Sequence, residues 1–215
     1  MRVKPGVHTY DLEWEGFREP LSVHVVEADE TLLFGAGDVS TADELAEIAR
    51  DHEADAVVVE HGDADHYAGV PRLRESEPGI EVAVPAKDAS FLREDGVEPD
   101  VLLEPDDVYR GVKVVGAPGH TPGNAAYLYD DVLVAGDTVV GSDSVFARAS
   151  APDSKQSSES ALSVIEADWN ADDEEAVDSV GNLLEHGFDT VLVTHGSNVV
   201  GDAKREVERL IDGLE

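Results

Sequence analysis

The chain lacks cysteine and has few basic residues. Its 215 residues include no Cys, 1 Met, and 15 Lys+Arg against 48 Asp+Glu. The absence of cysteine excludes disulfides, thiolate metal ligands and a cysteine nucleophile. Any metal ion must therefore be held by histidine and carboxylate side chains.

Long apolar runs are also missing. No window approaches the roughly 18 apolar residues that a membrane span needs, and residues Met1 to Gly6 have no apolar core of the signal-peptide type. We therefore expect a cytoplasmic protein that does not bind membranes. No basic stripe is visible, and the acidic excess opposes a phosphate backbone, so we expect a small-molecule substrate rather than a nucleic acid. The oligomeric state, including a homodimer, stays open.

The acidic excess itself needs an explanation. The formal net charge is −33, yet 41% of the residues are hydrophobic, which indicates a folded chain. Binding of cationic partners could account for this charge, and so could a very salty cytoplasm, where the Debye length falls to about 3 Å at 1 M salt. The acids are spread along the whole chain, which favours salt adaptation, and the scarcity of lysine resembles proteins of halophilic archaea. Low salt should then loosen the fold.

Periodicity predicts one domain over residues 1–215, with two β-rich halves and helices outside them. Strands are expected at Val7–Glu13, Leu21–Glu27, Thr31–Phe34, 56–59, Ile80–Val84, Val101–Glu104, Val112–Val115, Ala125–Tyr129, Val132–Ala135 and Thr190–Val193. Helices are expected at Thr41–His52, Tyr67–Glu75, Lys87–Glu94, Ser160–Ala167, Asp173–His186 and after His195 through Leu210. The serine- and acid-rich stretch Ala151–Glu159 predicts a mobile connector or the edge of a cleft. The resulting fold class is α/β (α+β), a four-layer αββα sandwich.

One short stretch concentrates potential metal ligands. His61-Gly62-Asp63-Ala64-Asp65-His66 directly follows the apolar run at residues 56–59, and two further apolar runs lead to Asp137 and to His195. Loops at strand ends are where sites are usually assembled. Imidazole and carboxylate ligands without thiolate suit zinc, iron or manganese.

This stretch resembles the His-x-His-x-Asp-His signature of the metallo-β-lactamase superfamily, with Asp63 where the family has its second histidine. Three further motifs follow in the family's order: Gly119-His120-Thr121-Pro122-Gly123, Ala135-Gly136-Asp137-Thr138 and Thr194-His195-Gly196. The family often has an Asp-Thr-Gly turn below the metal site, but Gly35-Ala36-Gly37-Asp38 lacks that aspartate. One usual support of the ligands is therefore in doubt.

The resemblance implies a centre for two metal ions, expected to be zinc, with iron or manganese as alternatives. His61, His120 and Asp63 would hold the first ion. Asp65, His66 and His195 would hold the second, and Asp137 would bridge both. Asp65 is also the expected catalytic residue. The implied reaction is hydrolysis by a metal-bound hydroxide of a small-molecule ester, thioester, lactone or phosphoester.

Asp63 leaves two other functions open. Three carboxylates and one hydroxide would neutralise two divalent ions completely, which weakens the centre as a Lewis acid or suits it to ferric iron. Flavodiiron oxidoreductases resemble it here, because they carry a glutamate in this slot. The chain could thus be a di-iron redox or oxygen-handling protein, or a metal-binding module with weakened catalysis.

Residues outside the motifs are expected to play structural parts. His8, His24, His52 and His186 have no ligand spacing, so we interpret them as structural or exposed. Tyr67, which follows the ligand stretch, could contact substrate or simply pack.

Overall fold

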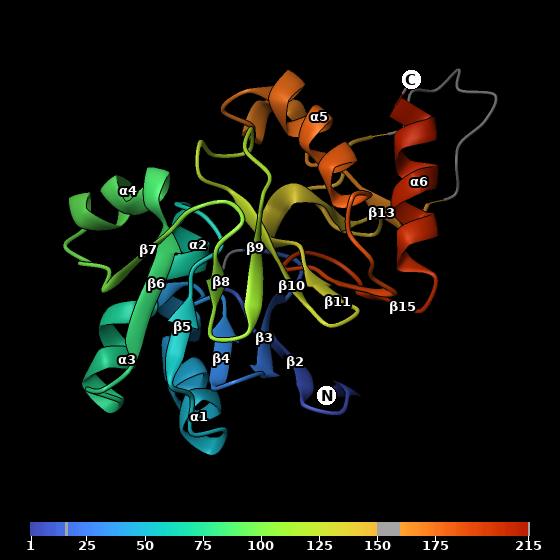
Figure 1. Ribbon diagram of the computed structural model, residues 1–215. Helices are drawn as coiled ribbons and strands as arrows, with labels where there is room; N and C mark the ends of the chain where they lie inside the picture. Colours follow the sequence, from blue (N-terminus) through green and yellow to red (C-terminus); the bar gives the residue numbers. More distant parts are fainter. Residues whose placement is uncertain (16, 150–159, 215) are drawn as a thin grey trace.

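The computed structural model describes residues 1–15, 17–149 and 160–214 (Figure 1). The stretch Ala151–Glu159, expected to be a connector, lies outside these residues. The first half of the chain forms a seven-stranded sheet whose spatial order follows the sequence. Its strands are β1 (Arg2–Lys4), β2 (Val7–Leu12), β3 (Leu21–Glu27), β4 (Thr31–Phe34), β5 (Ala56–Val58), β6 (Glu81–Pro85) and β7 (Val101–Leu103).

The second half forms a six-stranded sheet in the order β15-β14-β11-β10-β9-β8. Its strands are β8 (Val108–Tyr109), β9 (Val112–Gly116), β10 (Ala125–Tyr129), β11 (Val132–Val134), β14 (Thr190–Leu192) and β15 (Val199–Val200). Two short strands, β12 (Val140–Gly141) and β13 (Leu162–Ser163), pair separately.

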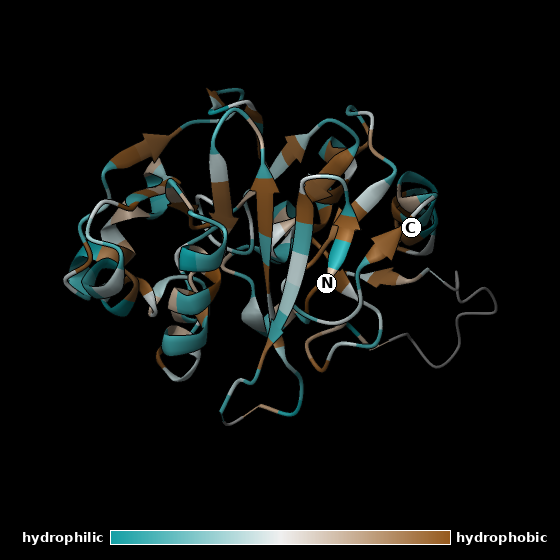
Figure 2. Ribbon diagram, turned by 90° about the horizontal axis from the view of Figure 1, so that it is seen from below, coloured by the Kyte–Doolittle hydropathy of each residue, from teal (hydrophilic) through white to brown (hydrophobic). Residues whose placement is uncertain are grey.

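Helices cover the outer faces of both sheets (Figure 1). The first sheet is covered by α1 (Ala42–Asp51), α3 (Val70–Ser76) and α4 (Ala89–Glu94), and the second by α5 (Asp173–Leu183) and α6 (Ala203–Leu214). Figure 2 shows apolar strands in the middle of the molecule and helices with polar residues at its sides. None of the helices in the described part of the chain is long and apolar enough to cross a membrane.

Strand periodicity explains the layers. Leu33 of β4 points outward into the cluster with the helices, whereas its neighbour Phe34 points into a third cluster between the sheets. Leu133 and Val134 of β11 divide in the same way on the other sheet. Successive side chains of a strand alternate between faces, so fully apolar strands fill an inner and an outer core together. The predicted αββα sandwich is confirmed.

The helix predicted at Ser160–Ala167 is wrong. Leu162 pairs with Gly141 in the small antiparallel sheet, and Ile165 forms an isolated bridge with Ala147. The β-branched Val164 and Ile165 are both buried in this extended arrangement, which suits their restricted side chains better than a helix does. The helix predicted at Tyr67–Glu75 is instead two helices, α2 (Ala64–Tyr67) and α3, with Gly69 between them.

Gly69 sits where the chain has no room for a side chain. A Cβ atom there would lie 2.1 Å from the carbonyl oxygen of Ala36. The backbone N–H of Gly69 also donates to the oxygen of Gly37. This close approach ties the start of α3 to the loop after β4, and so holds the ligand stretch against the first sheet.

Candidate metal centre

The predicted ligands all follow strands and gather at one end of the two sheets. His61 and Asp63 lie in the loop after β5, and Asp65 and His66 lie on α2 directly behind it. The other three follow strands of the second sheet: His120 comes after β9, Asp137 after β11, and His195 after β14. Because β11 and β14 are parallel neighbours, their carboxyl ends lie side by side, and Asp137 and His195 follow them at the same end of the sheet.

The first predicted group is assembled around Asp63. Its Oδ2 atom lies 3.0 Å from Nε2 of His120 and 3.7 Å from Nε2 of His61. Both imidazoles are buried, whereas the Asp63 side chain is 46% exposed. Ligand atoms of these three residues lie close enough together to hold one metal ion.

The second predicted group is assembled around Asp65. Its Oδ2 atom lies 3.2 Å from Nε2 of His195 and 3.9 Å from Nε2 of His66. Here too one ligand atom from each residue falls within the span of a single ion. The two groups therefore offer three side chains each.

Asp137 lies between the two groups. Its Oδ2 atom is 3.5 Å from Nε2 of both His120 and His195, and 3.9 Å from that of His61. Its Oδ1 atom is 3.6 Å from Nε2 of His66. A carboxylate that faces all four histidines is positioned to bridge two ions.

Unpaired buried atoms show that this cluster suits a cation. Several polar atoms have no hydrogen-bond partner within the part of the chain that the structure describes: both ring nitrogens of His61, Nε2 of His66, and Oδ1 of Asp137. Leaving such an atom unpaired costs about 1–3 kcal/mol. Nitrogen and carboxylate donors that converge in this way match zinc, iron or manganese.

Charge pairing in the cluster gives it protons to release. Burial lowers the pKa of His61. Burial acts the same way on His195, but Asp137, Asp65 and Glu19 outweigh it and raise its pKa to about 9. Burial opposes ionisation of Asp137, yet His195 and His66 hold its pKa well below the ordinary value. The histidine protons neutralise the carboxylates, and a bound cation would displace these protons.

Two histidines are oriented from behind by polar side chains. Nδ1 of His66 lies 3.1 Å from Oε2 of the fully buried Glu60, and Nδ1 of His120 lies 3.1 Å from Oδ1 of Asn170. Such partners fix the ring so that Nε2 faces the metal. Sequence analysis missed Glu60 and Asn170, although Glu60 is the one charged residue between the apolar run and His61.

Glu60 also bears on the missing aspartate of the family turn. Its carboxylate oxygens lie 3.6 and 3.7 Å from the position that a Cβ of Gly35 would occupy. Gly35 has a φ of +81°, which favours glycine. Glu60 thus places a carboxylate below the centre, beside the turn from which the family's aspartate is missing.

A buried aspartate joins the ligand loops of the two sheets. Asp88 accepts hydrogen bonds from the N–H groups of Gly62 and Gly123, at 2.9 and 2.7 Å, and from the hydroxyl of Thr121 at 2.5 Å. Gly62 is next to His61, and Thr121 is next to His120. One carboxylate therefore sets the distance between two candidate ligands that come from different sheets.

Above the centre opens a cavity of about 290 Å³. Aromatic side chains form one wall, in which Trp14 stacks on Phe17 and the edge of Phe146 meets Trp169. His120, His195 and several acids also line it, and no Lys or Arg among the described residues does. The cavity thus combines an apolar wall with a floor of candidate metal ligands.

Two further residues have structural roles. Tyr67 is buried, and its hydroxyl donates to Asp95 at 2.6 Å, so it packs rather than lining the cavity. His24 is fully buried between the sheets, where its Nε2 lies 3.2 Å from the carbonyl oxygen of Val193. The prediction of a structural His24 is confirmed.

The chain belongs to the metallo-beta-lactamase superfamily, since the profile of that family matches residues 16–177. Fold comparison agrees. A metallo-beta-lactamase from Pontibacter korlensis covers 100% of this chain and 97% of its own, with a TM-score of 0.71 and 19% identity. A beta-lactamase domain protein from Burkholderia ambifaria covers 97% of this chain and 71% of its own, with a TM-score of 0.72 and 17% identity. At these identities the likeness concerns the fold alone.

Curated relatives match part of the sequence. A hydroxyacylglutathione hydrolase from Photobacterium profundum is 34% identical over 89 residues, which are 40% of this chain and 33% of the relative. Another, from Methylobacillus flagellatus, is 31% identical over 110 residues, which are 51% of this chain and 43% of the relative. The chain thus matches less than half the length of either relative.

Proposed function

We propose that this protein is a metal-dependent hydrolase of small-molecule thioesters or related esters. The observation that carries the proposal is the pair of three-residue groups with Asp137 between them and with unpaired, buried ligand atoms. The hydroxyacylglutathione hydrolase relatives support thioesters as the substrate class, since their name describes a thioester substrate. Lactones and phosphoesters remain in the panel to be tested.

The chain's own residues would divide the work. Bound zinc would supply a Lewis acid and lower the pKa of a water molecule to about 7. His66 and His195 outweigh the effect of burial and keep the pKa of Asp65 below its ordinary value. Asp65 would therefore be ionised and, at the edge of the cavity, would accept and hold the proton of the attacking water. Glu60 and Asn170 would keep two histidines in their orientation.

The cavity indicates which part of a substrate it would accept. The wall of Trp14, Phe17, Phe146 and Trp169 suits an apolar acyl or thiol group. Glu15 and Asp38, which line the cavity but are not candidate metal ligands, disfavour substrate carboxylates or phosphates beside them. We expect thioesters with neutral apolar groups to be better substrates than anionic ones.

Hydrolysis of a matched panel tests this proposal. Zinc-, manganese- and iron-loaded protein in molar KCl is assayed on thioesters, esters, lactones and phosphodiesters, with neutral and anionic members of each pair. The expected result is hydrolysis of neutral thioesters that is strongly reduced in Asp137→Asn. If no member is hydrolysed by any metal form, while Asp63→His creates activity, the wild-type chain is a metal-binding module instead.

Asp63, the third carboxylate among the candidate ligands, also supports a second candidate function, that of a di-iron redox protein. Asp63 approaches His120 to 3.0 Å, so a group at the position of the family's second histidine adds negative charge to the first site. Protein expressed in iron-rich medium should then hold iron and show an absorption band that responds to reductant. A colourless protein that contains only zinc would rule out this alternative.

The charge of −33 supports a saline cytoplasm as the working environment. We expect the midpoint of thermal unfolding to rise steadily as KCl increases towards molar concentrations, because salt screens the repulsion between surface acids. Sodium sulfate at equal ionic strength is a useful comparison, since it also strengthens apolar burial. A midpoint that does not change with KCl would contradict salt adaptation.

A further inference from the structure

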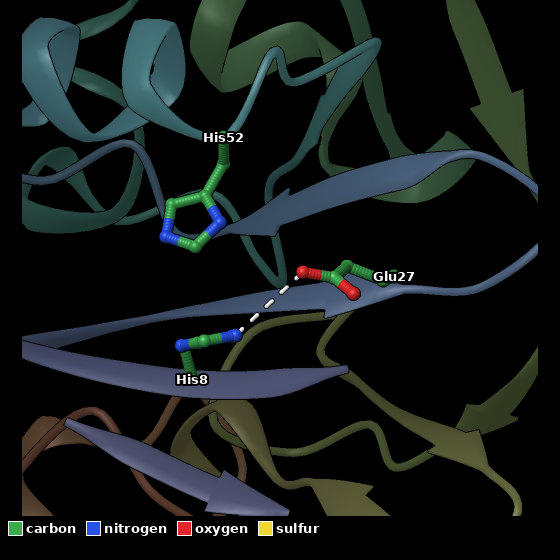
Figure 3. A group of neighbouring side chains, drawn as sticks. All are labelled: His8, Glu27 and His52. Atoms are coloured by element: carbon green, nitrogen blue, oxygen red, sulfur yellow. Dashed lines mark ion pairs between the residues drawn. The ribbon is translucent and has the colours of Figure 1, made fainter. Parts of the chain in front are cut away.

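Two histidines that are far apart in sequence meet on the outer face of the first sheet. His8 lies on β2, and His52 follows the last residue of α1. Glu27, the last residue of β3, joins them. Figure 3 shows these three side chains pointing toward one another. Sequence spacing gave no reason to connect them, and none belongs to the centre described above.

The fold brings the three residues together for simple reasons. His8 pairs with Val25 in the antiparallel ladder, and Glu27 lies two residues further along β3, on the same face as Val25. Diagonal neighbours of this kind are within reach of long side chains. α1 packs on that face through Leu45 and Ile48, and its end places His52 above β2.

The distances suit a small cation. Nε2 of His8 lies 3.6 Å from Oε1 of Glu27, and the imidazole rings of His8 and His52 are 4.8 Å apart. One ligand atom from each residue lies within 4.8 Å of the other two. Tetrahedral ligands at zinc bond lengths are separated by about 3.4 Å. The Glu27 side chain is 53% exposed, so a modest rotation would complete the approach.

A tyrosine orients His52. The hydroxyl of Tyr10 lies 2.6 Å from its Nε2 atom, which leaves Nδ1 as the free ligand atom. Tyr10 stands two residues after His8 on the same face of β2, so this strand supplies both a ligand and the partner that orients another.

Positively charged groups act on His8 from nearby. Burial, the neighbouring His52, Arg2 and the N-terminal ammonium group lower the pKa of His8, and Glu27 only partly opposes them. Arg2 and the N-terminal ammonium group also weaken the attraction of this cluster for a metal ion, so this site should bind less tightly than the buried centre.

We propose that His8, Glu27 and His52 bind a divalent transition-metal ion, best matched by zinc, with water at the remaining position. Two imidazoles and a carboxylate are an established zinc ligand set. The ion would link β2 and β3 to the end of α1, and so brace the N-terminal strands against the helical layer. This site is independent of the proposed hydrolase function.

Zinc binding by untagged protein tests this site, since a polyhistidine tag would itself bind the metal. The triple variant His61→Ala, His66→Ala, Asp137→Asn takes one histidine from each group of the main centre together with the carboxylate between them, and is titrated with zinc in molar KCl. We expect one zinc per chain and a higher thermal unfolding midpoint with zinc than without. Adding Glu27→Gln or His52→Gln should weaken this binding about 10- to 100-fold and abolish the rise in midpoint.

Asp51→Asn is the matched control, because Asp51 is exposed and adjacent to His52, and its change removes the same charge as Glu27→Gln. Binding should be retained in this variant. The proposal is overturned if the triple variant binds no zinc, or if Asp51→Asn weakens binding as much as Glu27→Gln does. In protein with an intact main centre, Glu27→Gln should likewise bind one zinc fewer and keep its hydrolytic rate.

Discussion

The two histidine clusters use the same kinds of side chain in opposite surroundings. The main cluster lies at the strand ends, with His61 and His66 fully buried; both ring nitrogens of His61 and Nε2 of His66 have no hydrogen-bond partner among the described residues. The second cluster lies on a sheet face, where Glu27 is half exposed. Water can satisfy the second cluster, whereas the first has no such substitute. Burial therefore turns a set of ligand residues into one that needs its ion.

Removal of Asp137 should produce the largest difference between the clusters. Asp137→Asn keeps the side-chain shape but loses the charge that faces all four histidines. We expect kcat/KM for the best thioester to fall about a thousandfold, because the metals contribute several kcal/mol to such reactions. His52→Ala should leave kcat/KM unchanged. An equal loss in both variants would show that the clusters act as one site.

The residues behind the ligands should show a smaller difference. Glu60 orients His66 in the interior, and Tyr10 orients His52 near the surface. Glu60→Gln should weaken zinc binding at the main centre about 10- to 100-fold, whereas Tyr10→Phe should weaken binding at the second cluster by less. Zinc affinities from chelator competition measure both. If the free energy of unfolding of the metal-free Glu60→Gln variant equals that of the metal-free wild type, Glu60 acts by positioning His66 and not by stabilising the fold.

The loss of stability at acid pH should distinguish the buried His24 from the partly exposed His8. Burial lowers the pKa of His24 to about 4, whereas in the unfolded chain it is about 6.5. The unfolded state therefore binds the additional proton, and the free energy of unfolding falls as pH decreases from about 6.5 towards 4. At pH 5 this loss is about 2 kcal/mol relative to pH 7.

His24→Gln removes that proton while keeping a donor for the carbonyl of Val193. Urea unfolding in EDTA and molar KCl, at pH 7 and pH 5, should show a smaller loss for this variant than for the wild type. His8→Gln is the comparison, and it should retain most of the wild-type loss. The same loss in His24→Gln and the wild type would contradict the assignment to His24.

The sequence predicted secondary structure best where a single periodicity of apolar residues dominated a segment. The apolar strands and the helix at Thr41–His52 follow simple patterns, and the predicted layers are the observed ones. It failed at Ser160–Ala167, where local composition permits a helix but burial of Val164 and Ile165 beside β12 favours an extended chain. Tertiary packing overrides local preference in such short segments.

The candidate ligands could be named in advance because they occur in motifs. Their supports could not, since Asn170 is 50 residues from His120 and meets it only in the folded chain. The same holds for His8 and His52, which no local spacing connects. Contacts between elements depend on helix docking and strand register, which a single sequence specifies only through the complete fold.

The hydrogen bonds of Asp88 have a consequence for how this protein could be remodelled. Because one carboxylate holds the turn at Gly62 and the turn at Thr121–Gly123, neither loop is a separate module. A loop transplanted from a homologue would need to bring a hydroxyl and an N–H in the same register, or be accompanied by a changed residue 88. Directed evolution of a new substrate range should therefore tolerate exchanges in the aromatic wall far more readily than changes in loop length beside His61 or His120.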